Sequence, residues 1–253
     1  MSILSSLRKG FRAQHRAVQV LIVVVLAAAV VLALALGSLY LIGTIFYYDS
    51  YSSDYTYELT VDVDGPADEV IVYAPAPVQD GEVQVGELYV WEHAGLGVED
   101  WSFDVVETEH GPMLEVTLSG VEADASVDVI GDLESDRTID TREPRGNEPV
   151  LSPMSEVGER PVDTDRFPDY RAWDVTSTAY VEHSGDEDVT VGIWTSHEGA
   201  NTWWSGGWGG NYYTSEVSTY DTTPDPDGEW IDLSGSHRQG FGSYGGILPP
   251  PPR

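Results

Sequence analysis

The feature that most constrains this chain is an apolar segment near its N-terminus, residues 18–46. From Val20 to Leu36 no side chain in it is polar. As an α-helix rising ~1.5 Å per residue, the segment would extend for roughly 40 Å, which exceeds the ~30 Å hydrocarbon layer of a bilayer. We therefore predict a single transmembrane helix over residues 18–46, with the lipid bilayer as its partner.

The charges on the two sides of this segment predict its orientation. No acidic residue occurs before Asp49, and the first 48 residues carry a charge of +4. Segment 1–17 is therefore predicted to be cytoplasmic, and everything after Asp49 to lie outside the cell membrane. Tyr47 and Tyr48 are expected at the outer membrane interface, where aromatic residues are enriched. The basic residues that set this orientation are Arg8, Lys9, Arg12 and Arg16.

Two kinds of cleaved leader are alternatives to a permanent anchor. A secretory signal would end at Ala33-Leu34-Ala35, a small-x-small exit, but the apolar run continues beyond it to Phe46. A pilin-type signal at Lys9-Gly10 would require an apolar stem directly after it, where this chain has polar residues. The anchor is the better prediction.

A stripe of small residues within the span suggests that two helices pack together. Ala29, Ala33 and Gly37 are spaced four apart, which would let membrane helices approach closely. A homodimer through this stripe is one expectation. The alternative is that an alanine-rich span produces the stripe by chance.

Residues 49–253 carry eight arginines, no lysine and all 43 acidic residues, a charge of −35. This charge excludes a nucleic-acid partner, because such binders neutralise phosphates with Lys and Arg. Acidic side chains hold water and hydrated cations in concentrated salt, where a Debye length of ~3 Å screens their repulsion. We therefore predict the ectodomain of a halophile. A calcium-dependent surface protein and a disordered acidic chain are the alternatives.

Beyond the helix, apolar residues recur at every second position, which is typical of strands. Glu58–Val63 alternates in this way, and Trp101–Thr108 with Met113–Leu118 predicts a hairpin that turns Trp101, Phe103 and Val105 inward. The expected order is a stalk (47–57), a first β-rich half (58–133), an Arg/Pro-rich linker or surface loop (134–172), a second β-rich half (173–238) and a Gly/Pro-rich tail (239–253).

The second β-rich half has fewer than about 70 residues and no disulfide, and a separate core of that size is marginal. The predicted fold is therefore a transmembrane helix followed by an all-β ectodomain, one composite antiparallel β-sandwich. Two small sandwiches are the alternative.

The most unusual cluster combines aromatic residues with four glycines. It predicts either an exposed platform on which sugar rings stack, a candidate glycan-binding site, or a glycine-bent strand whose indoles fill the core. Coplanar, exposed indoles would favour the glycan site. The cluster consists of Trp203, Trp204, Trp208, Tyr212 and Tyr213.

The sequence indicates no catalytic residue, cofactor or metal site. Acidic residues are so frequent that pairs about 5–9 Å apart would arise by chance. The histidines show neither HxH nor HExxH spacing. The stretch from Asp225 to Gly228 resembles part of an EF-hand loop, but Ser234 stands where an acidic ligand is required. We therefore lean against an enzyme.

Three stretches, Tyr73–Gly81, Val106–Leu114 and Asn201–Trp208, resemble a family of membrane-anchored haloarchaeal surface proteins without known activity. The resemblance implies origin and location, and it transfers no functional residue. Together these observations predict an envelope-associated structural or binding module that contacts surface-layer protein or envelope glycans. The alternatives are a surface hydrolase that uses two ectodomain carboxylates and a membrane-anchored subunit of a larger complex.

Overall fold

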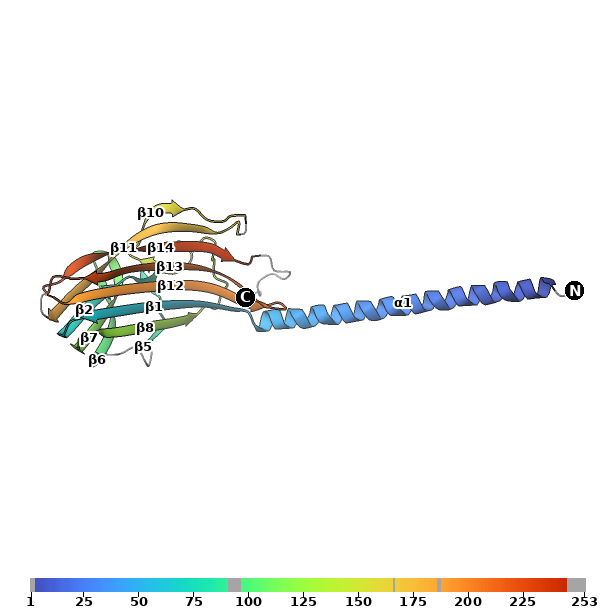
Figure 1. Ribbon diagram of the computed structural model, residues 1–253, viewed down its shortest axis with the longest axis horizontal. Coiled ribbons are helices and arrows are strands. Elements are labelled where there is room, and N and C mark those ends of the chain that lie inside the picture. Colours follow the sequence, from blue (N-terminus) through green and yellow to red (C-terminus); the bar gives the residue numbers. More distant parts are fainter. Residues whose placement is uncertain (1–2, 91–96, 166, 186–187, 245–253) are drawn as a thin grey trace. The chain divides into compact units, whose positions relative to one another are not determined.

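The computed structural model describes residues 3–90, 97–165, 167–185 and 188–244, with side chains from Val18 onward. The chain divides into two compact units, Met1–Asp49 and Ser50–Arg253. The first is the helix α1 (Ile3–Asp49), and the second is an all-β domain (Figure 1). This arrangement confirms the predicted fold class, an N-terminal apolar helix followed by antiparallel strands.

The part of α1 from Val18 to Asp49 is long and apolar enough to cross a membrane. The large apolar side chains from Val18 to Phe46 are exposed, whereas Tyr47 near the end of the helix is buried. Two hydroxyl side chains are satisfied within the helix. The hydroxyls of Ser38 and Thr44 each donate to a carbonyl one turn earlier, at 2.9 Å. A lipid-facing helix requires such internal hydrogen bonding, because hydrocarbon offers no partners. A signal sequence near the N-terminus can meet the same criteria of length and composition, so the permanent anchor stays a prediction.

The β domain is built from fourteen described strands, and every pairing between them is antiparallel. They are β1 (Ser52–Asp64), β2 (Ala67–Ala74), β3 (Ala76–Gln79), β4 (Glu82–Val83), β5 (Glu87–Val90), β6 (Asp100–Thr108), β7 (Gly111–Val121), β8 (Ala125–Glu134), β9 (Val150–Ser152), β10 (Ser155–Arg160), β11 (Arg171–Gly185), β12 (Thr190–Trp204), β13 (Trp208–Thr222) and β14 (Glu229–Gly242).

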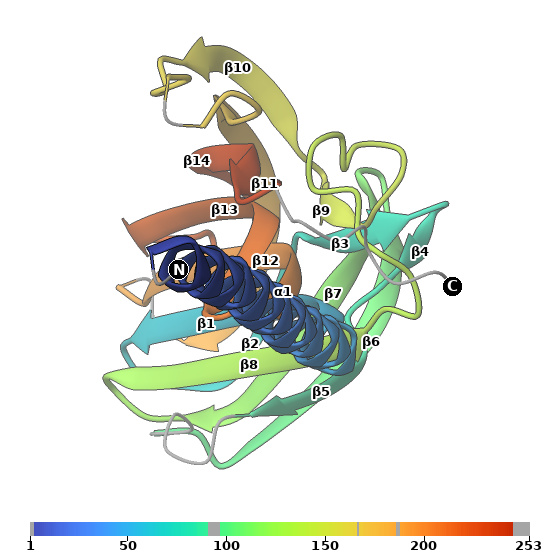
Figure 2. The ribbon, with the colours of Figure 1, turned by 90° about the vertical axis from the view of Figure 1, so that its right-hand side faces the viewer.

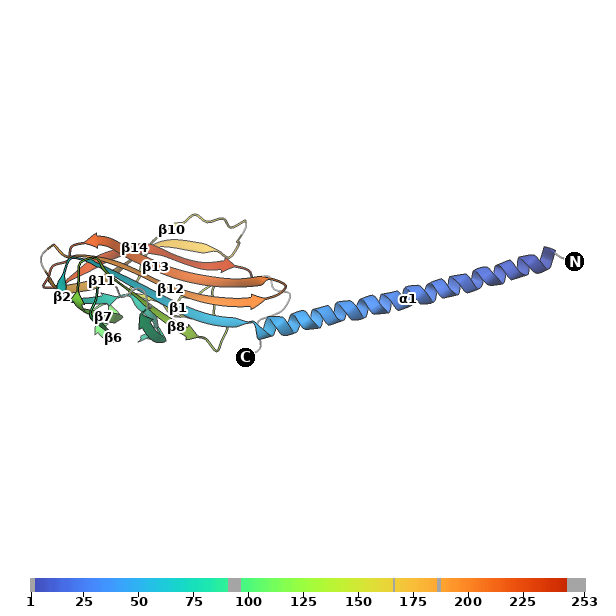
Figure 3. The same cartoon turned by 60° about the horizontal axis from the view of Figure 1, so that its bottom comes forward.

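Eleven strands form one large sheet in the order β5-β8-β1-β12-β13-β14-β11-β2-β7-β6, with β10 paired to β11. A small sheet, β4-β3-β9, accompanies it. Figure 2 shows the large sheet bending round from β14 through β12 and β1 to β8 and β5, so that the domain is nearly barrel-like. The long strands β1, β12, β13 and β14 run side by side along the domain (Figure 3).

The two β-rich halves contribute neighbouring blocks of strands to this sheet, with β12, β13, β14 and β11 of the second half between β1 and β2 of the first. From the first half, β1 pairs with β12 of the second half along its whole length, and β2 pairs with β11. Neither half therefore has a complete sheet or core without the other. The domain is one composite fold, and the two-sandwich alternative does not apply.

The core lies between the inner faces of the bent sheet. Because alternate side chains of a strand point to opposite faces, Leu59, Val61 and Val63 of β1 are buried while Asp62 and Asp64 are exposed. The predicted hairpin forms as β6 and β7, and β7 buries its apolar residues. On β6, however, Trp101 is 39% exposed and Val105 is 48% exposed. The prediction is wrong for these two residues, because β6 lies at the edge of the sheet, whereas Phe103 is partly buried against the core.

The structure differs from the prediction of a stalk over 47–57. The helix α1 runs to Asp49 and β1 begins at Ser52, so only Ser50 and Tyr51 separate them. From Ser52 onward the predicted stalk is instead the start of β1, whose side chains alternate between the two faces, with Tyr55 and Tyr57 turned into the interior.

The stretch 134–172, predicted as a linker or surface loop, is only in part irregular. It contains β9 and β10, and its Ile139 and Glu148 are both 2% exposed. Four of its six arginines form ion pairs with acidic side chains. These are Arg137–Glu148, Arg142–Asp169, Arg145–Glu156 and Arg160–Asp174. At the other end of the domain, β14 continues to Gly242, and residues 245–253 of the predicted tail lie outside the described residues.

Candidate functional site

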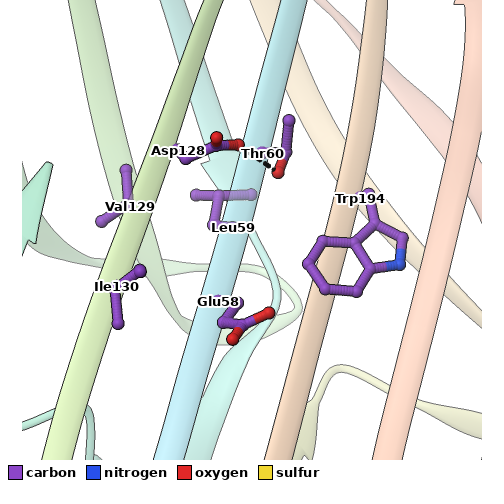
Figure 4. Close-up of a pocket in the computed structure, with 7 residues that line it drawn as sticks. All are labelled: Glu58, Leu59, Thr60, Asp128, Val129, Ile130 and Trp194. Carbon is purple, nitrogen blue, oxygen red and sulfur yellow. Dashed lines mark hydrogen bonds between the residues drawn. The ribbon is translucent and has the colours of Figure 1, made fainter. Parts of the chain in front are cut away.

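A shallow groove of about 320 Å³ lies on the outer face of β8, β1 and β12. Its polar lining consists of Glu58 and Thr60 from β1 and Asp128 from β8, and Trp194 from β12 forms one side. Figure 4 shows the Trp194 indole on one side of Glu58 and Thr60, with Asp128 and Ile130 on the other. The strand alternation that buries Leu59 and Val61 turns these residues outward.

The register of the three strands brings the lining residues together. Thr60 lies opposite both Asp128 and Trp194, and Glu58 lies opposite both Ile130 and Ser196. Residues about 65 to 135 positions apart in the chain thus become cross-strand neighbours, at the ~5 Å separation of opposed Cβ atoms. Sequence reasoning missed this site because no local motif encodes the pairing.

Hydrogen bonds orient two of the groove's side chains. The Thr60 hydroxyl donates to Asp128 Oδ1 at 2.6 Å, and the Trp194 indole N–H donates to Glu216 Oε1 at 3.1 Å. Farther along β12, burial and the neighbouring Glu58 charge raise the pKa of Glu198. The Trp194 indole, fixed by its hydrogen bond, lies beside the carboxylates of Glu58 and Asp128. This combination suits a ligand that has an apolar ring face and hydroxyl donors.

The predicted aromatic platform divides between two faces of the β12–β13 hairpin. Trp203 is 7% exposed and Tyr213 is wholly buried, whereas Trp208 is 76% exposed. Trp204 and Tyr212 are partly buried. The five residues therefore do not form one exposed plane, because strand alternation turns Trp203 and Tyr213 inward.

A buried polar network that the sequence did not reveal joins the 134–150 segment to the sheet. Glu148 is the one buried carboxylate among the residues that the structure describes. It accepts hydrogen bonds from the Tyr55 hydroxyl and the Arg137 guanidinium, both at 2.6 Å, and from the Asp140 N–H at 2.7 Å. Burial and these contacts with Glu148 raise the pKa of Tyr55.

His197 belongs to the same network and is fully buried. Its Nδ1 lies 3.2 Å from the Thr56 carbonyl oxygen, and its Nε2 lies 3.0 Å from that of Pro149. The Tyr213 hydroxyl also donates to the Pro149 oxygen, at 2.5 Å. Burial lowers the pKa of His197 to about 4, although the two carbonyl contacts act in the opposite direction. The imidazole is therefore neutral at pH 7, and its role is structural.

A second buried imidazole, His237, pairs with a serine. Its Nδ1 lies 2.8 Å from Ser215 Oγ, while its Nε2 is buried without a hydrogen-bond partner. We assign the hydrogen to Nδ1, because a buried lone pair without a partner costs less than a buried N–H without one. Burial and the Arg145 charge lower the pKa of His237 to about 4. Both side chains are wholly buried, so a substrate has no access to this Ser–His pair.

The predicted hydrolase requires two convergent carboxylates in a pocket. Within the described ranges only Glu148 is buried, and its oxygens are occupied by structural hydrogen bonds. In the same ranges no group of three or more His, Asp or Glu side chains is placed to hold a metal ion. The groove around Trp194 does bring two carboxylates, Glu58 and Asp128, to one face of the sheet, and both are half-buried.

The residues predicted to face the membrane all belong to α1. Tyr47 and Tyr48 lie in its last turn, with ring centroids 5.3 Å apart. At Gly37, the last member of the small-residue stripe, a Cβ would meet nothing within 4 Å. The side chains of Arg8, Lys9, Arg12 and Arg16 lie outside the described part of the chain.

No family model matches the chain, and no curated protein matches it. The haloarchaeal resemblance therefore stays a prediction from the sequence.

Proposed function

We propose that this chain is a single-pass membrane protein of a halophile, with a cytoplasmic N-terminus and an extracellular β domain that binds an envelope component. The observation that most supports this proposal is that the exposed apolar helix α1 is joined to β1 by only two residues. A helix of this length held in a bilayer would keep the domain at the membrane surface. The charges of +4 before the span and −35 after it support the orientation and the salt-rich surroundings.

The groove on β8, β1 and β12 is the proposed binding site, and a glycan is the proposed ligand. A sugar ring would stack on the Trp194 indole while its hydroxyls donate to Glu58 and Asp128. Glycans on surface-layer protein or elsewhere in the envelope carry this chemistry. This proposal replaces the platform of Trp203, Trp204 and Trp208, whose indoles point to different faces.

Protease added to intact cells tests the topology. Cleavage should remove the domain beyond Asp49 and leave a tag before Arg8 intact. Full protection of the domain would overturn the orientation. The intact mass of the membrane-bound protein distinguishes anchor from signal: an anchored chain retains residues 1–35, and a cleaved one lacks them.

Titration of the full-length, detergent-solubilised protein with isolated envelope glycans tests the binding site. Trp194→Ala should weaken binding about tenfold, since a stacked aromatic ring contributes ~1–1.5 kcal/mol. Trp101→Ala, on the edge strand β6, is the matched control and should bind normally. Equal affinity of the Trp194 variant and the parent would refute the site. Glycan cleavage that is lost in Glu58→Gln would instead support the hydrolase.

A further inference from the structure

The longest uncharged run after α1 coincides with the tip of one hairpin. Residues 199–215 contain no Asp, Glu, Lys or Arg, although the domain from Ser50 onward holds all of the chain's 43 acidic residues except Asp49. The run covers the end of β12, the turn and the start of β13. At Gly206 and Gly207 in the turn, a Cβ would meet nothing within 4 Å, so the tip is open to its surroundings.

Contacts within the domain hold this tip beside the residues at which the chain enters it. The backbone N–H of Trp204 donates to Ser50 Oγ at 2.8 Å. The ring of Trp203 stacks on that of Tyr51, with centroids 6.0 Å apart and planes 8° apart. Ser50 is the residue that follows Asp49, the last residue of α1. The uncharged tip and the chain's exit from the predicted membrane span therefore belong to the same end of the domain.

The depth of the uncharged end matches the thickness of a membrane interface. On β1, β12 and β13 the first charged residue is Asp54, which lies opposite Ala200. The four paired positions from Trp204 back to Asn201 carry no charged residue on these strands, and they span roughly 10 Å along the strand direction. Each polar interface of a bilayer is ~5–8 Å deep. Elsewhere the strongly acidic surface would be repelled by anionic headgroups.

Trp208 points away from the protein at this end. Its 76% exposure is the highest of any aromatic residue among the described residues of the domain. Tryptophan is enriched at bilayer interfaces, where its ring is apolar and its N–H remains hydrated. We propose that the β12–β13 tip is a second membrane contact, in which Trp208 inserts into the outer interface of the bilayer that α1 spans. The inference rests on the proposed anchoring by α1.

Single spin labels on the full-length chain test this contact, and the absence of native cysteine makes labelling specific. Nitroxides are attached to Gly207→Cys at the tip, to Tyr220→Cys at the opposite end of β13, and to Ala29→Cys within α1. Tyr220 is the matched control, since it is 69% exposed on the same strand. The protein is reconstituted in phosphatidylglycerol vesicles in molar salt, and relaxation by oxygen and by a water-soluble nickel chelate is measured.

We expect the labels at 29 and 207 to lose relaxation by nickel and to gain relaxation by oxygen, while the label at 220 remains accessible to nickel. Adding Trp208→Ser to the Gly207→Cys chain should restore nickel access at the tip. A label at 207 as accessible as that at 220, with 29 still in lipid, would overturn the contact and leave the anchor intact. Dipolar broadening between tips of two copies would overturn it in favour of self-association. Nickel access at 29 would show that the anchor itself fails.

Discussion

Acid should destabilise the β domain through its two buried imidazoles. His197 and His237 are wholly buried, and burial lowers both of their pKa values from 6.5 to about 4. Between pH values of about 4 and 6.5, the unfolded chain therefore binds more protons than the folded one. The contribution to stability is therefore full above pH 6.5 and is lost as the pH falls toward 4.

The magnitude follows from the two pKa values. At pH 5 an imidazole with a pKa of 6.5 is almost fully protonated in the unfolded chain, and one with a pKa of about 4 is almost fully neutral in the folded domain. The difference costs about 2 kcal/mol per imidazole relative to pH 7.5, and ~3 kcal/mol below pH 4. Two such groups would lower the free energy of unfolding by ~4 kcal/mol at pH 5. This is a large part of the ~5–15 kcal/mol by which a typical domain is stable.

Urea unfolding at pH 7.5 and pH 5 measures this loss. The full-length chain is unfolded in detergent and molar salt, which screens the carboxylates that also titrate, and near-UV circular dichroism follows its tryptophans. His197→Gln and His237→Gln should each lower stability at pH 7.5 but reduce the difference between the two pH values by about 2 kcal/mol. His110→Gln, exposed in the β6–β7 turn, is the matched control and should keep the full difference. If both buried-site variants keep it as well, the reasoning is refuted.

Three further outcomes follow from the packing and the charge. Glu148→Gln should lower the free energy of unfolding by ~3 kcal/mol, because it leaves a buried network without its charge, whereas Asp169→Asn at an exposed ion pair should cost less than ~1 kcal/mol. Gly199→Ala should cost ~1–3 kcal/mol in the same assay, since its Cβ would lie 2.3 Å from Tyr213 Cε1, while Gly207→Ala in open space should be neutral. Lowering salt from molar to ~0.1 M should loosen the domain and weaken its near-UV signal, because −35 of charge is then poorly screened, and an unchanged signal would contradict the halophilic reading.

Local sequence patterns predicted the elements better than their partners. The alternation in Glu58–Val63 identifies β1, and the uninterrupted apolar run identifies α1. Each of these signals is carried by residues that are close together in the sequence. The pairing of β1 with β12 joins residues about 125 to 150 positions apart, for which no local signal exists. Alternation also predicts which side chains share one face of a sheet, but not whether another element packs on that face. Trp101 therefore shares the face of Leu118 but remains exposed at the sheet edge.

The candidate site and the buried network show the same limit. Glu148 stands in a stretch rich in arginine and proline, where an acidic residue is expected to be solvated. Its burial depends on Tyr55 and Arg137, which reach it from 93 and 11 positions away. Likewise Trp194 is an ordinary strand tryptophan until β1 and β8 place carboxylates beside it. A site that forms through the pairing of distant strands can therefore be recognised only in the folded structure.

The short connection between α1 and β1 limits where a partner of the groove can be. Ser50 and Tyr51 separate the two elements, so at most ~10 Å of chain joins Asp49 to Ser52. Glu58 and Thr60 lie six to eight residues farther along β1, which adds roughly 20–27 Å. The groove can therefore reach no farther than about 35–40 Å from the end of α1. With α1 in a bilayer as proposed, a ligand of the groove would lie close to the membrane, which is where the proposed envelope glycan would have to be.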